Sequence, residues 1–100
     1  MREIKFRVFD NISNRLHDWN TIRNNKFKDF DLEHYNLMQY TGLKDKNGTD
    51  IYEGDIVKEY LGGNTVIYSI KWDKGLAKWS IWSGRIIEII GNIHQNKELL

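Results

Sequence analysis

The side chains that most often carry catalysis or hold metal ions are few in this chain and widely spaced. Its three histidines are His17, His34 and His94, and it contains no cysteine. The chain therefore has no thiolate nucleophile, no disulfide and no cysteine-based zinc site. No Gly-x-Ser-x-Gly turn presents a serine nucleophile either. We expect no catalytic residue, no cofactor and a protein that is not an enzyme.

One short segment has the composition of a metal or acid–base site, because Asp29, Asp31, Glu33 and His34 follow one another closely. Carboxylates at alternate positions of a loop usually form a solvated surface, since Asp and Glu are mostly exposed. We therefore expect no metal site here. A hydrolase that uses Asp31 and His34 is the third alternative for function.

The stretch from Asp45 to Val57, DKNGTDIYEGDIV, contains two tight-turn signals, Asn47-Gly48 and Glu53-Gly54. It is not an EF-hand, because the glycine needed at the sixth loop position would fall on Asp50. Asn and Gly tolerate positive φ, which predicts a turn at Asn47 and Gly48. A second turn is predicted at Gly54, with Asp55 accepting hydrogen bonds from its amides. We interpret these four residues as structural.

Alternation of apolar and polar residues, the period of a β-strand, dominates the chain. Residues 3–19 predict a hairpin with its turn near Asn11 to Asn14. Further strands are predicted with turn signals about every ten residues. They cover residues 35–43, 55–60, 65–72, 76–82 and 85–93.

This spacing is typical of an all-β barrel or sandwich. We predict a single domain over residues 1–100, with an SH3-like barrel core at roughly residues 37–94. The barrel is extended by the N-terminal β-hairpin and by an irregular loop at residues 20–36. A Gly54-Asp55 turn before the first long strand suits such a barrel.

The pattern also predicts local environments. Val66, Tyr68, Ile70 and Trp72 share one apolar face of their strand. Residues 85–90 are apolar on both faces, which predicts a central strand. A short helical turn is expected around Asp31 to Asn36. The C-terminal residues either form one helical turn capped by Asn96 or lie against the barrel.

The net charge of +1 is spread evenly along the chain. Residues 1–50 carry nine basic and eight acidic side chains, and residues 51–100 carry six of each. A protein that neutralises phosphates usually has a basic stripe, which is missing from this sequence. No apolar run approaches the ~20 residues of a membrane span. We expect a cytoplasmic protein that does not contact a membrane.

Two tryptophans are the strongest candidates for a binding surface. In LAKWSIWSG, Trp79 and Trp82 fall on opposite faces of a regular strand, so both indoles cannot enter one core. Either one indole is exposed, or the hairpin or the loop at residues 20–36 covers it. Because Trp is enriched at interface hot spots, we predict partner binding by Trp79 and Trp82, flanked by Lys78 and Arg85.

Nucleic acid or a nucleotide is the alternative ligand of this aromatic and basic face. Lys71, Lys74, Lys78 and Arg85 lie beside the aromatic residues in the sequence. Stacking rings next to basic groups are typical of single-strand binding. Asp73, Glu59 and Glu88 dilute the positive charge, so protein binding is preferred.

Four segments resemble the YopX-like family of small phage and prophage proteins: MREIKFRVFD, LMQYTGLKDKNGTDIYEGDIVK, IKW and EIIGNIHQNKELL. The resemblance extends over essentially the whole chain. It implies an all-β SH3-type barrel, phage or prophage origin and self-association into a homo-oligomer. It implies no activity and no catalytic residues. His94 and Lys97 depart from the aromatic residue and the proline common in the family ending, so His94 is not expected to be an essential ligand.

From these observations we expect a non-enzymatic phage or prophage accessory protein that binds a host or phage protein. The resemblance, and no particular residue, suggests a role in host regulation or counter-defence.

Overall fold

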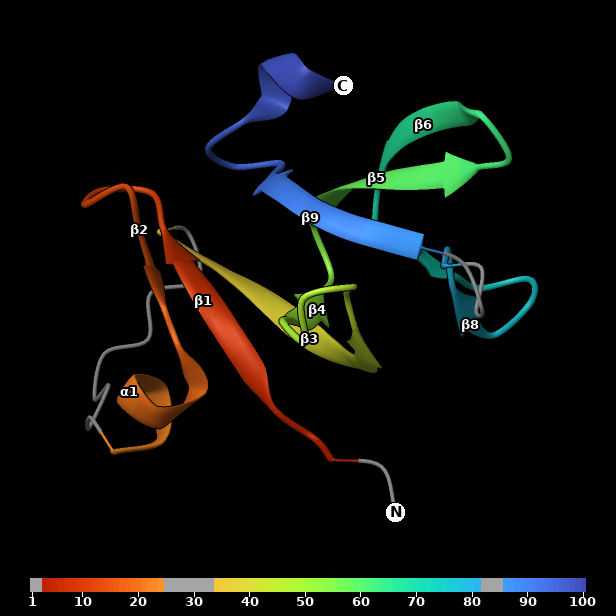
Figure 1. Ribbon diagram of the computed structural model, residues 1–100. Helices are drawn as coiled ribbons and strands as arrows, with labels where there is room; N and C mark the ends of the chain where they lie inside the picture. The colour runs from red at the N-terminus through yellow and green to blue at the C-terminus, as the bar shows by residue number, and fades with distance from the viewer. Residues whose placement is uncertain (1–2, 25–33, 82–85) are drawn as a thin grey trace.

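The computed structural model describes residues 3–24, 34–81 and 86–100 (Figure 1). Its elements are β1 (Phe6–Asp10), β2 (Arg15–His17), α1 (Trp19–Asn24), β3 (Tyr35–Lys44), β4 (Asp50–Tyr52), β5 (Asp55–Leu61), β6 (Asn64–Ser69), β7 (Trp72–Asp73), β8 (Lys78–Trp79), β9 (Ile86–Asn92) and a C-terminal 3-10 turn, η1 (Lys97–Leu99). Two curved antiparallel sheets, ordered β2-β1-β3-β4 and β6-β5-β9, lie beside a small β7-β8 ribbon. The predicted all-β, barrel-like fold is confirmed.

The N-terminal hairpin forms where the alternating pattern predicts it. β1 and β2 are antiparallel, with Val8 opposite His17 and Asp10 opposite Arg15. Between them, the Asp10 carboxylate accepts hydrogen bonds from the backbone N–H groups of Ile12 (2.9 Å) and Ser13 (3.3 Å). Asn14 completes the turn with φ of 59°, a conformation that Asn tolerates better than most residues.

Helix α1 was not predicted, and it occupies the start of the segment expected to be an irregular loop. Asp18 caps it, because its Oδ1 accepts the Thr21 N–H at 2.8 Å. The Trp19 ring packs on Phe6 of β1, with 6.0 Å between the centroids. Of the helical turn expected around Asp31 to Asn36, residues 31–33 lie outside the described residues. Tyr35 and Asn36 are in β3, so the prediction is wrong for them.

β3 is a ten-residue strand that pairs with a different strand along each of its two edges. Its first half, Tyr35 to Gln39, pairs with β1, and its second half pairs with β4 at Tyr40 and Lys44. The register shifts between Tyr40 and Lys44, where Gly42 adopts φ of 88°. β4 was not predicted, because three residues between two turns are too short to show a period.

The central strand of the second sheet is not the one that was predicted. β5 is its central strand, paired with β6 on one side and β9 on the other. β9 is therefore an edge strand of this sheet, and Ile86 at its start is 58% exposed. The apolar pattern of residues 85–90 was wrongly interpreted as that of a central strand. Only part of that pattern faces the core, since Ile87 is buried and Ile89 is half-buried.

The strand predicted at residues 65–72 is interrupted. β6 ends at Ser69 because the backbone of Ile70 bonds elsewhere: its N–H donates to Asp55 O (2.8 Å), and its carbonyl accepts the Gly54 N–H (2.9 Å). Ile70 is buried as predicted, but Val66 and Trp72 are exposed, so the four residues do not share one buried face. Of the strand predicted at residues 76–82, the described part, residues 76–81, contains only the two-residue strand β8.

The hydrophobic core consists of two clusters. One lies under the second sheet and contains Ile51, Val57, Ile70, Trp79 and Ile87. The other lies against the first sheet and contains Phe9, Met38, Tyr40 and Tyr52. Phe9 shows that the N-terminal hairpin contributes to the core.

The C-terminal turn lies where it was predicted, but Asn96 does not cap it. No hydrogen bond joins the Asn96 side chain to the 3-10 turn. Its Oδ1 instead accepts the Asn92 N–H at 3.1 Å, which ties the C-terminal segment back to β9.

Candidate functional site

Asn47 and Gly48 form the predicted turn. Gly48 has φ of 81°, and the Asp45 carboxylate accepts N–H groups of Asn47 (2.9 Å) and Thr49 (3.0 Å). The same carboxylate accepts the Ile89 N–H of β9 at 3.2 Å. Burial opposes its ionisation, but the Thr49, Ile89 and Asn47 amides outweigh burial and lower the pKa of Asp45. The turn is thereby attached to the second sheet.

Gly54 forms the corner between the two sheets. Its φ is 87°, its N–H donates to Ile70 O, and its carbonyl accepts the Ile93 N–H, both at 2.9 Å. A Cβ at this position would lie 2.8 Å from Met38 Cε. Glycine is therefore required here by conformation and by space.

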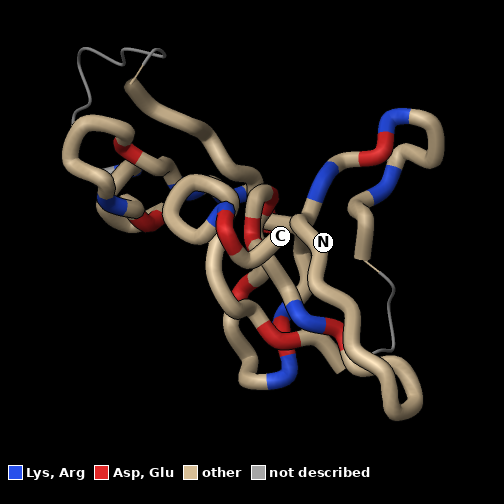
Figure 2. The backbone as a smooth tube through the Cα atoms, turned by 90° about the horizontal axis from the view of Figure 1, so that it is seen from above, with Lys and Arg blue, Asp and Glu red and all other residues tan. Residues whose placement is uncertain are grey.

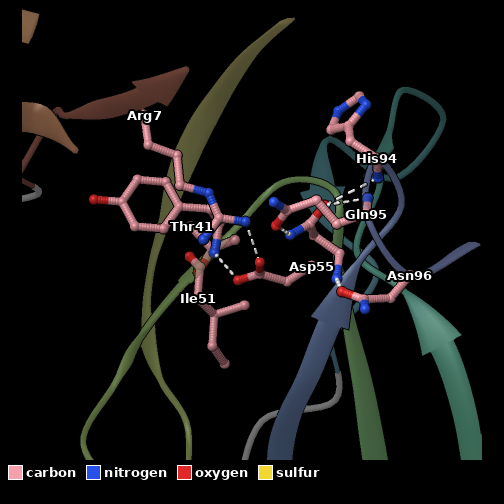
Figure 3. Close-up of polar contacts among 9 residues, drawn as sticks. Arg7, Thr41, Ile51, Asp55, His94, Gln95 and Asn96 are labelled. Carbon is pink, nitrogen blue, oxygen red and sulfur yellow. Dashed lines mark hydrogen bonds and ion pairs between the residues drawn. The ribbon is translucent and has the colours of Figure 1, made fainter. Parts of the chain in front are cut away.

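Asp55, the next residue, is 1% exposed and holds the corner from inside (Figure 3). Its Oδ2 accepts the Tyr52 N–H at 2.8 Å, and its Oδ1 pairs with the Arg7 guanidinium from β1. That guanidinium also lies over the Tyr52 ring, 4.7 Å from its centroid. Burial raises the pKa of Asp55, against the opposing effects of Arg7 and the Tyr52 N–H. Gly54 thus forms the predicted turn, and Asp55 accepts one of the turn amides.

A second polar cluster lies beside this corner (Figure 3). The Asn92 side chain accepts the N–H groups of His94 and Gln95, both at 3.0 Å. The His94 ring stacks on Phe9 of β1, with 4.9 Å between the centroids and 9° between the planes. Burial and the charge of Arg7 lower the pKa of His94. His94 therefore acts as a packing residue between the C-terminal segment and the hairpin.

A metal site is not assembled in the described part of the chain. Within residues 3–24, 34–81 and 86–100, no three His, Asp or Glu side chains are placed to hold a metal ion. Asp29, Asp31 and Glu33 lie outside these ranges, and the hydrolase alternative based on Asp31 stays a prediction.

The four residues predicted to bind a partner lie in different environments or outside the described residues. Trp79 is 7% exposed and belongs to the core under the second sheet. Lys78 is exposed. Trp82 and Arg85 lie outside the described residues, so the choice between the two indoles is answered only for Trp79. The rings of Trp79 and Trp72 form a T-shaped pair, with 5.0 Å between the centroids. Trp72 is the indole of this pair that reaches the surface, at 41% exposed.

Apolar side chains are instead exposed on β6, part of the strand for which the sequence predicted a single apolar face. Val66 and Ile67 are each 44% exposed, on opposite faces of the strand. β6 is one of the two outer strands of its sheet (Figure 1), and its six residues, NTVIYS, carry no charge and no proline. The outer strand β2, by contrast, has three residues, of which Arg15 is basic. Natural proteins usually protect an edge with short length or charge, and β6 has neither.

The backbone of β6 presents hydrogen-bonding groups to that open side. Gly62 and Gly63, with φ of 48° and 95°, make a two-residue turn of the hairpin type, flanked by the pair Leu61 and Asn64. Hydrogen-bonded pairs alternate along an antiparallel ladder, starting at the residues that flank such a turn. Val66 therefore bonds to β5, while Thr65 and Ile67 direct their N–H and C=O groups outward.

Charge is mixed over the fold rather than collected on one face (Figure 2). Asp50 accepts both Lys5 and Lys44, with 2.6 Å between each Nζ and the carboxylate, and Lys46 pairs with Glu88 at 3.3 Å. Two lysines and a tyrosine lie together on the outer face of the second sheet. Lys46 and Lys58 place their Nζ atoms 5.3 and 5.7 Å from the ring centroid of Tyr60, which is 36% exposed.

The chain matches the family model described as YopX protein over residues 8–100. It belongs to the YopX family. This YopX-family chain is also similar to a solved structure, the crystal structure of protein EF1440 from Enterococcus faecalis. The two share 24% sequence identity with a TM-score of 0.71, covering 100% of this chain and 99% of the other. That likeness shows the fold alone, and no curated protein matches the chain.

Within the described ranges, no helix has the length and apolar character needed to cross a bilayer.

Proposed function

We propose that this YopX-family protein is a non-enzymatic phage or prophage accessory protein that works in the cytoplasm by binding other proteins. The observation that supports the proposal is the unprotected edge of β6. Its outward N–H and C=O groups and the exposed Val66 and Ile67 can be satisfied together by an added strand. The partner is a second copy of the chain or a host or phage protein, and interference with host regulation or defence is the proposed purpose.

Self-association suits this edge because β6 carries no charge that would oppose a second β6. Two β6 strands related by a two-fold axis would pair antiparallel and bury the same side chains from both copies. The exposed Trp72 and Leu76 (64% exposed), on and next to β7, follow β6 in the chain and offer further apolar contact area. The buried Trp79 packs against Trp72 and so supports this surface from the core side.

The test is affinity capture from host-cell lysate with matched variants. Ile67→Pro removes an outward N–H without touching the β5–β6 bonds, and Ile67→Thr keeps that N–H while removing apolar surface. We expect wild type to retain a defined protein, Ile67→Thr to retain less of it and Ile67→Pro to lose it. Equal capture by wild type and folded Ile67→Pro would refute the role of this edge.

Nucleic acid is a second candidate, supported by Lys46 and Lys58 around the exposed Tyr60. Phosphate-driven binding weakens steeply as salt rises, whereas an apolar strand interface changes little. Capture repeated with nuclease, and at low and physiological salt, separates the two candidates. Loss of capture with nuclease would favour nucleic acid.

A further inference from the structure

A second unused strand edge lies on β3, far along the chain from β6. The Tyr40 N–H donates to Lys5 O (2.9 Å), and the Asn11 N–H donates to His34 O (2.8 Å). Along an antiparallel ladder, every second residue of a strand bonds to its neighbour. Because His34 and Tyr40 bond to the residues that flank β1, Asn36 and Met38 between them bond to β1 itself. The N–H and C=O groups of Leu37, between them, therefore point away from β1.

The strand that would continue along that side stops before reaching Leu37. β4 ends at Tyr52. The Glu53 N–H donates to Gln39 O at 2.8 Å, and at Gly54 the chain turns away into β5. The open edge at Leu37 is thus in line with β4 and beyond its end.

A groove of about 350 Å³ runs beside this edge. β3 forms one wall and the segment Ser69 to Lys71 lines it as well, with the Gly54 corner between them. The wall at Ile70 is fixed, because both its backbone groups bond to residues 54 and 55. Apolar contact comes from Met38, Ile93 and Leu37, whose side chain is 52% exposed.

We propose that this groove binds an extended peptide segment of a partner protein, added as a strand to the edge of β3 at Leu37. An extended backbone supplies the alternating donor and acceptor that Leu37 lacks, whereas a helix has no free backbone groups along its length. The groove is at the small end of ligand sites, which suits an extended segment rather than a helix about 10–12 Å across. Glu53 and Lys71 both line it, so the complementary segment carries a basic and an acidic side chain around an apolar one.

This inference rests on the proposed function, protein binding, and names a class of partner and a second place for it. It is independent of β6, because no β6 residue before Ser69 lines the groove. The two sites are therefore separable by substitution.

The probe is a phage-displayed library of random octapeptides, selected on the wild-type protein. A selected peptide is synthesised with a fluorophore, and its affinity is measured by anisotropy for wild type, Leu37→Pro, Leu37→Thr and Ile67→Pro. We expect Leu37→Pro to weaken binding about tenfold or more, because proline removes the outward N–H. Leu37→Thr keeps that N–H and should retain most of the affinity, and Ile67→Pro should bind as wild type does.

Amide hydrogen exchange on the wild-type protein gives a second readout, which does not depend on the folding of Leu37→Pro. The Leu37 amide should exchange markedly more slowly with the selected peptide bound. No enriched peptide, equal binding by folded Leu37→Pro, or an unchanged Leu37 exchange rate would overturn the inference. Loss of the peptide site with lysate capture at β6 intact would leave the proposed function standing.

Discussion

The Gly54-Asp55 corner, at the start of β5, and the outer edge of β6 belong to the same strand hairpin, but their polar groups are arranged in opposite ways. At the corner, Gly54 has both backbone groups bonded, and the Asp55 carboxylate is bonded on both oxygens. At β6, Thr65 and Ile67 turn their backbone groups to an open side and Ile67 exposes an apolar side chain. The difference separates residues that hold the two sheets together from residues available to a partner.

The largest effect should come from removing the buried carboxylate of the corner. Asp55→Ala leaves the Arg7 guanidinium, whose side chain is 14% exposed, without its ion-pair partner. Losing one partner of a buried pair costs about 3–5 kcal/mol, so we expect a loss of that size in the free energy of unfolding, measured by urea denaturation.

Asp50→Ala is the matched control at the surface. Asp50 also contacts two basic groups, Lys5 and Lys44, but its side chain is 23% exposed and Lys44 is largely solvated. Lys5 is only 16% exposed, but Asp50 itself keeps contact with water, so this variant should lose clearly less than Asp55→Ala. Equal losses for Asp55→Ala and Asp50→Ala would remove the distinction between corner and surface.

A smaller loss is expected for Gly54→Ala. Positive φ costs an L-residue about 1–2 kcal/mol, and the new Cβ would also press on Met38 Cε. Gly48→Ala carries the conformational cost alone, since a Cβ there meets nothing within 4 Å. Thermal denaturation of both variants should therefore show the lower midpoint for Gly54→Ala. The reverse order would mean that Met38 does not restrict the corner.

The pH dependence of stability offers a finer test of the packing beside the corner. The pKa of His94 lies below its ordinary value of 6.5 in the folded chain, so the unfolded chain binds the proton more readily. The contribution of His94 to the free energy of unfolding is fully present above pH 6.5, and it is lost as the pH falls through the lower pKa of the folded chain. His94→Phe keeps a ring against Phe9 and should flatten the decline between neutral and mildly acidic pH, measured as denaturant midpoints. An identical decline in both proteins would assign it to other groups.

Burial of Tyr68 gives the smallest and most local effect. Burial and the nearby charge of Glu59 raise the pKa of Tyr68 to about 12. In a spectrophotometric titration of the folded protein, this phenol should therefore ionise after the exposed tyrosines. Tyr68→Phe should remove the last phase, and its persistence in the variant would assign it to another tyrosine.

Much of the corner could be predicted from the sequence, because its signals are local. A glycine that needs positive φ, followed by an aspartate that can accept turn amides, identifies Gly54 and Asp55 without knowledge of the rest of the fold. The hairpin at residues 3–19 and the strands β3 and β5 follow from period-two patterns in the same way. The start of helix α1 could also have been predicted, because Asp18 lies three residues before Thr21 and is an N-cap signal.

The β6 edge could not be predicted by the same means, because exposure of a strand depends on sheet order. Val66 and Ile67 have the composition of buried strand residues, and only the placement of β5 between β6 and β9 leaves them at the surface. Trp79 illustrates the converse, since its burial depends on Ile51, Val57 and Ile87 from three other strands. The ion pair between Arg7 and Asp55 likewise joins residues 48 positions apart.

Sedimentation velocity of the wild type, Ile67→Thr and Ile67→Pro over a range of concentrations tests the central claim most directly. If the β6 edge joins copies of the chain, the wild-type sedimentation coefficient should rise with concentration, and folded Ile67→Pro should sediment as a monomer throughout. A rise of the same size in Ile67→Pro would place self-association elsewhere and contradict the claim, whereas a monomeric wild type would leave only a host or phage protein as the partner of this edge.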